Sequence, residues 1–181
     1  MEEALKVGTA FAERRRTPDP RVPVLGEKWI PRDGRCLASA RRFVRDVAAD
    51  WNAAEDVQEV AELLASELVT NALTHGAVGV PATSTVRVTV GRERELIVVE
   101  VHDCCAALPR PRRATDSELR GRGLAIVQAL SHDWGWTLTP TGKSVWFQLV
   151  AWPGNDLVAA ASKACAAHLW RADSTAVMTN T

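Results

Sequence analysis

The sequence lacks the features that mark several large classes of protein. Its 22 lysine and arginine residues balance its 22 aspartate and glutamate residues, and this formal net charge of zero argues against direct binding to nucleic acid. No apolar run reaches the roughly 18 residues of a membrane-spanning helix, and the first residues lack a signal-peptide pattern. With 181 residues and no internal repeat, the chain is expected to fold without a membrane and around one domain.

Cysteine is also scarce. The four cysteines are Cys36, Cys104, Cys105 and Cys165, and they show neither CxxC spacing nor the nearby histidine pattern of a zinc site. This usage, without a secretion signal, is typical of a reducing compartment, so we expect a cytoplasmic protein.

Composition divides the chain into three regions. Residues 1–22 mix charge with proline and are expected to form a flexible arm, whereas residues 23–153 carry the periodic apolar patterns of a folded domain. Residues 154–181 begin rich in alanine, which predicts a C-terminal helix followed by a frayed tail.

Apolar residues at helical spacing predict two long helices in the first half of the domain, at residues 38–51 and 56–74, after an edge strand at residues 22–30. The later elements are expected at residues 85–90, 96–101, 124–131, 134–139 and 144–150, with a charged turn at 91–95 and an arginine-rich loop at 106–120. The strand at 96–101 is almost continuously apolar, which indicates a central strand that is covered, at least in part, on both faces.

Three polar residues fall on the apolar side of the second helix. Glu67, Asn71 and His75 are each four residues apart, so at roughly 100° per residue they line up along one face, with Glu67 at the edge of the stripe. Burying such groups without partners costs on the order of 1–3 kcal/mol each. Either the protein supplies their partners, as a structural network, or a bound ligand does.

Other residues offer contacts that suit a nucleotide. Gly121 and Gly123 run into a helix start, where free backbone N–H groups and the helix dipole favour phosphate, although such pairs are often plain turns. Asn71 can offer an amide oxygen to Mg²⁺, and Glu67 can polarise a hydroxyl or water near a γ-phosphate. Asp103, at the end of the central strand, can accept a hydrogen bond from an amino group such as that of adenine, or it can cap a turn.

Four motifs, in this order, resemble one family. Residues 67–75 look like the N box, and residues 103–109 the first glycine box, of the ATPase superfamily that includes gyrase, heat-shock chaperones, histidine kinases and MutL. Residues 121–130 are similar to its second glycine box, and residues 142–146 to its final hairpin. The likeness spans residues 30–150. It is strongest to the anti-sigma-factor serine kinases and to single-domain ATP-binding regulators of actinobacteria.

The resemblance implies a fold, two cofactors and a site. The fold would be an α+β two-layer sandwich, with helices on one face of a mixed, largely antiparallel sheet. ATP and Mg²⁺ would bind, with Glu67 as general base, Asn71 at the metal, Asp103 at the adenine amino group and residues 110–120 as a lid. The residues implied at the nucleotide are Asn71, His75, Asp103, Leu108, Arg120, Gly121, Arg122, Gly123, Leu124, Lys143 and Ser144.

The chain departs from the family at Cys104 and Cys105, where glycine or serine is usual. These thiols either fill a turn as small residues or form a vicinal disulfide.

Three functions stay open. The first is a serine/threonine kinase that phosphorylates an anti-anti-sigma protein and binds a sigma factor. The second is a regulator that binds ATP without phosphotransfer, and the third is a protein adaptor without nucleotide, which the presence of both Glu67 and Asn71 argues against. Whether the chain forms a homodimer also stays open.

Overall fold

The computed structural model describes residues 22–75, 84–107 and 122–153. The chain divides into two units, Met1–Ala151 and Trp152–Thr181, and every described helix and strand belongs to the first. The expected arm up to residue 21, the C-terminal helix and the whole of the expected lid, residues 110–120, lie outside the described residues.

The described elements follow the order that the sequence predicts. They are β1 (Val24–Pro31), the 3₁₀ turn η1 (Gly34–Cys36), α1 (Leu37–Asp50), α2 (Glu55–His75), β2 (Thr85–Glu93), β3 (Leu96–Asp103), α3 (Gly123–Leu130), β4 (Asp133–Thr139) and β5 (Gly142–Val150). The largest difference is at the expected turn 91–95, because β2 runs on to Glu93 and the chain reverses at Arg94, which has a φ of 56°.

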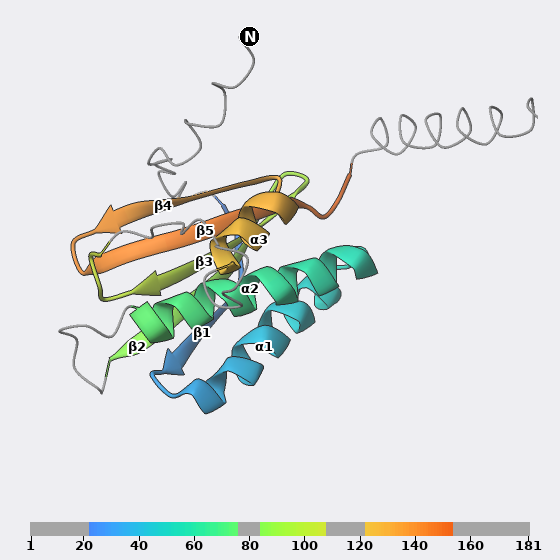
Figure 1. Ribbon diagram of the computed structural model, residues 1–181. Coiled ribbons are helices and arrows are strands. Elements are labelled where there is room, and N and C mark those ends of the chain that lie inside the picture. The colour runs from blue at the N-terminus through green and yellow to red at the C-terminus, as the bar shows by residue number, and fades with distance from the viewer. Residues whose placement is uncertain (1–21, 76–83, 108–121, 154–181) are drawn as a thin grey trace, which may run out of the picture. The chain divides into compact units, whose positions relative to one another are not determined.

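The five strands form one sheet in the order β1-β2-β3-β5-β4, shown in Figure 1. All four strand pairs are antiparallel, so the expected mixed sheet has no parallel pair among the described strands. β3 lies in the middle of the sheet, which confirms the central strand predicted from its apolar run.

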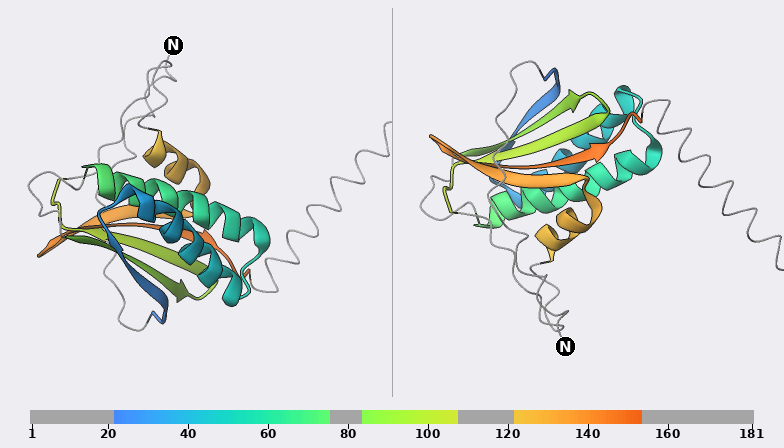
Figure 2. Two further views of the ribbon diagram at one scale, coloured as in Figure 1. Left: turned by 90° about the horizontal axis from the view of Figure 1, so that it is seen from below. Right: turned by 90° about the horizontal axis from the view of Figure 1, so that it is seen from above.

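The helices cover a single face of this sheet, as the views in Figures 1 and 2 show together. On β3 the side chains of Val99 and Val101 point to the helices, and their partners across the sheet are Phe147 and Val145 on β5. These residues are at most 8% exposed. The result is the two-layer α+β arrangement that the resemblance implied.

The C-terminal end of α2 is tied to the strands by Arg32, which follows β1. Its Nη1 donates to the Ala72 carbonyl oxygen at 3.0 Å, and its Nε donates to the Ser84 hydroxyl at 2.6 Å. Carbonyl groups in the last turn of a helix have no intrahelical partner, so this contact stabilises the helix end. None of the described helices is long and apolar enough to cross a membrane.

Two adjacent leucines of α2 provide a test of which face of this helix packs against the sheet. Leu64 is 0% exposed, so Leu64→Ala is expected to lower the free energy of unfolding by about 2–5 kcal/mol through lost burial and a residual cavity. Leu63 is 42% exposed, and Leu63→Ala should cost less than about 1 kcal/mol. Denaturant unfolding compares the two variants, and equal losses would show that α2 does not bury the face described.

Candidate functional site

The start of α3 packs directly against the polar edge of α2. A Cβ atom placed on Gly123 would lie 2.5 Å from Glu67 Oε2 and 3.5 Å from Asn71 Nδ2. Only a glycine therefore leaves the Glu67 carboxylate where it stands. The structure thus brings together three of the predicted site residues, from two motifs that are far apart in the sequence.

Glu67 and Asn71 are both half-buried, and neither side chain has a hydrogen-bond partner within residues 22–75, 84–107 and 122–153. The sequence left two alternatives for these polar groups, a structural network or a ligand. The described part of the chain supplies no such network, and both alternatives stay open at this point.

The N-terminus of α3 offers backbone donors at the same place. Its N-cap is Arg122, which makes no side-chain capping bond, and the first helical hydrogen bond runs from the Ile126 N–H to the Arg122 carbonyl oxygen at 2.9 Å. The N–H groups of the first helical residues before Ile126 lack an intrahelical acceptor. Together with the helix dipole, they favour an anion beside Glu67 and Asn71.

A buried ion pair joins the end of β3 to the start of β5. Lys143 Nζ lies 2.9 Å from each carboxylate oxygen of Asp103, and the side chains of Asp103 and Lys143 are 1% and 8% exposed. Lys143 also donates to the Cys105 carbonyl oxygen at 2.9 Å, while the Cys105 N–H donates to Asp103 Oδ1 at 2.8 Å. Asp103 is therefore held from two sides at the place where the sequence predicts an adenine contact.

Sequence reasoning named both residues of this pair but missed that they contact each other. The signal is the strand register, because Asp103 pairs with Lys143 across β3 and β5. Gly142, with φ of 149°, makes this pairing possible, since a Cβ there would overlap the Asp103 carbonyl oxygen and the Cys104 backbone.

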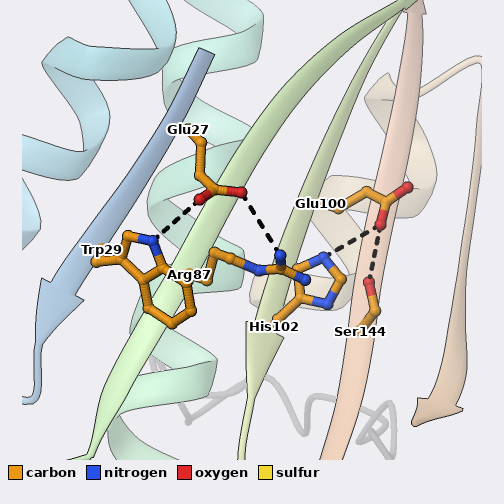
Figure 3. A network of polar contacts seen from close by, with 6 residues as sticks. All are labelled: Glu27, Trp29, Arg87, Glu100, His102 and Ser144. Carbon is orange, nitrogen blue, oxygen red and sulfur yellow. Dashed lines mark hydrogen bonds and ion pairs between the residues drawn. The ribbon is translucent and has the colours of Figure 1, made fainter. Parts of the chain in front are cut away.

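Ser144 lies on the other face of the sheet. Its hydroxyl donates to Glu100 Oε2 at 3.3 Å, and the same carboxylate oxygen lies 3.3 Å from His102 Nε2 (Figure 3). Beside this group, Glu27 accepts from the indole of Trp29 at 3.0 Å and lies 3.5 Å from Arg87. The structure therefore does not bring Ser144 to Asp103 and Lys143, although the sequence placed it at the nucleotide.

The remaining predicted residues are only partly described. Leu124 is 9% exposed in the first turn of α3, and Arg122 is exposed just before it. Leu108, Arg120, Gly121 and the side chain of His75 lie outside the described residues. Cys104 is exposed and Cys105 buried, and both are free thiols, so the structure has the two small side chains rather than the vicinal disulfide.

Comparison with known proteins supports this arrangement. A family model described as a histidine kinase-like ATPase domain matches residues 30–149, which is more than half of the 181-residue chain. The matched segment runs from the end of β1 almost to the end of β5, and so it includes Glu67, Asn71, Asp103 and Gly123. A search of curated proteins found no match.

The buried pair predicts a large loss of stability when one partner is neutralised. Asp103→Asn would leave the Lys143 ammonium buried without a counter-charge, and the free energy of unfolding should fall by about 3–5 kcal/mol. Glu62→Gln is the control, because the side chains of its pair with Arg45 are 45% (Arg45) and 25% (Glu62) exposed, and the pair should contribute less than about 1 kcal/mol. Thermal or denaturant unfolding measures both, and losses of similar size would mean that the pair does not carry this energy.

Proposed function

Because this chain belongs to the family of histidine kinase-like ATPase domains, we propose that it is an ATP-binding regulator that phosphorylates a serine of a protein partner. The observation that carries the proposal is the contact of Gly123 with Glu67 and Asn71. It brings together a helix N-terminus that suits phosphate, an amide that suits Mg²⁺ and a carboxylate that can take up a proton.

The two ends of the nucleotide have separate places in this proposal. The phosphates lie at the N-terminus of α3, beside Glu67 and Asn71, and the adenine lies at the buried pair of Asp103 and Lys143. The donor set at the phosphate end fits Mg²⁺, which takes few protein ligands besides waters and phosphate oxygens, and Asn71 would hold it through its amide oxygen. When bound, the ion would neutralise charge on the phosphates.

Glu67 has the chemical role. The serine hydroxyl oxygen of the partner forms a bond to the γ-phosphorus, and the bond from that phosphorus to the bridging oxygen breaks, which releases ADP. The hydroxyl proton passes to the Glu67 carboxylate as general base. Glu67 is half-buried and has no described partner, so it is available to accept that proton.

The partner in this proposal is an anti-anti-sigma protein, and a sigma factor is the second protein that the anti-sigma branch would bind. Support for this part is the resemblance of the motifs, and the setting would be the cytoplasm. A regulator that responds to ATP without transferring phosphate has the same nucleotide site, so phosphotransfer is what separates the two functions.

Nucleotide binding predicts a ligand-dependent gain in stability. Mg-ATP at about one hundred times its dissociation constant should add about 2.7 kcal/mol to the free energy of unfolding. Asn71→Ala should abolish the part of this gain that requires Mg²⁺, whereas Thr74→Ala, at an exposed position on the same helix, should keep it. Thermal-shift titration gives the result, and no shift of the unaltered protein with ATP or ADP would refute nucleotide binding.

Phosphotransfer predicts that Glu67→Gln separates chemistry from binding. The amide keeps the size of the side chain, so the affinity for ATP should change by less than about tenfold, or about 1.4 kcal/mol. Transfer of labelled phosphate to the partner should fall by about 10²–10⁴-fold, since the general base is lost.

Gly123→Ala is an independent probe of the same carboxylate. The new methyl group must displace the flexible end of Glu67, so transfer should fall while the protein stays folded. Gly34→Ala is the matched control, because a Cβ there meets nothing within 4 Å. If the unaltered protein binds ATP and its partner tightly yet transfers no phosphate over hours, the function without phosphotransfer replaces the kinase.

A further inference from the structure

The hydrogen-bond donors and acceptors of the buried pair, Asp103 and Lys143, determine which groups of a nucleobase can bind there. A lysine ammonium has three donors, and Lys143 has three acceptors within 2.9 Å, namely the two carboxylate oxygens of Asp103 and the carbonyl oxygen of Cys105. Hydrogen bonds to Oδ1 and to the Cys105 carbonyl oxygen, with the ion pair to Oδ2, direct the Lys143 ammonium to these three oxygens.

Asp103 is left with one oxygen, Oδ2, that accepts no hydrogen bond from the described residues. Each carboxylate oxygen can accept about two hydrogen bonds, and Oδ1 already accepts from Lys143 and from the Cys105 N–H. Oδ2 lies 2.9 Å from Lys143 Nζ in the ion pair and accepts no hydrogen bond from any described residue. Oδ2 is therefore the oxygen of Asp103 that is open to a donor of the ligand.

We infer that Lys143 determines the nucleobase specificity of the site. It acts by positioning Asp103, so that Oδ2 can accept from an exocyclic amino group, as on adenine, while the ammonium is engaged by Asp103 and Cys105 rather than by a 6-oxo group, as on hypoxanthine. This inference rests on the proposed function, since it concerns the base of the bound nucleotide. It gives Lys143 a role through Asp103 rather than through direct contact with the nucleotide.

Burial makes this arrangement selective. A buried polar group that faces the wrong partner cannot turn to water, and sites built around such a group reject analogues strongly. A carboxylate without Lys143 would have more open acceptor positions and could turn toward the N1–H of hypoxanthine. Loss of Lys143 should therefore weaken the distinction between the two bases rather than only weaken binding.

The test is the ratio of the dissociation constants of ITP and ATP, measured by calorimetry with Mg²⁺ present. For the unaltered protein we expect ATP to bind at least about 100-fold more tightly than ITP. In Lys143→Met the ratio should fall at least about tenfold, which corresponds to about 1.4 kcal/mol. Lys143→Gln, which can still donate two hydrogen bonds without a charge, should show a smaller fall and covers the case in which Lys143→Met does not fold.

Lys28→Met is the matched control. Lys28 lies on the helix-facing side of β1, 5.6 Å from the centre of the Phe43 ring, so its loss also removes one positive charge from that side of the sheet. The ITP-to-ATP ratio should stay unchanged in this variant.

The outcomes separate specificity from structure. A purely structural Lys143 would weaken ATP and ITP equally, and an unchanged ratio in a folded Lys143 variant overturns the inference. Equal binding of ATP and ITP by the unaltered protein overturns it without any variant, while ATP binding itself still stands. If the unaltered protein binds neither nucleotide, the proposed function fails and this inference fails with it.

Discussion

The apolar packing of α2 on the sheet is the contact on which the site depends. Leu64 and Leu68, one helical turn apart, are 0% and 2% exposed, so they fix the rotation of the helix about its axis. That rotation carries Glu67 and Asn71 to the edge that faces α3. The polar groups of the site are therefore positioned by hydrophobic contacts on the same side of the helix, where Leu64 and Leu68 pack.

The second constraint is the ion pair of Asp103 and Lys143. Taking two charges out of water is costly, and apolar side chains of similar size often give equal or greater stability at such positions. The pair is thus weak support for a purely structural role. The pair joins the end of β3 to the start of β5, and the backbone of Cys105 forms hydrogen bonds with both side chains. It therefore gives a rigid polar group at one end of the candidate site.

Periodicity predicted the elements, because the buried face of α2 and the continuous apolar run of β3 depend on local sequence alone. It could not predict contacts that depend on strand register. The Lys143 pair with Asp103 and the placement of Ser144 on the opposite face both follow from how β5 is aligned with β3. Gly91 was taken for a turn residue, yet it lies inside β2, where Val22 and the Pro23 carbonyl oxygen leave little room for a side chain.

The alternation along β5 constrains how this protein can change in evolution. The side chains of two neighbours in the chain point to opposite faces of the sheet: Lys143 points toward the helices and Ser144 toward Glu100. A shift of β5 by one residue against β3 would exchange the two sides and take the ammonium away from Asp103. Changes in the turn between β4 and β5 are therefore tolerated only if they keep Lys143 opposite Asp103.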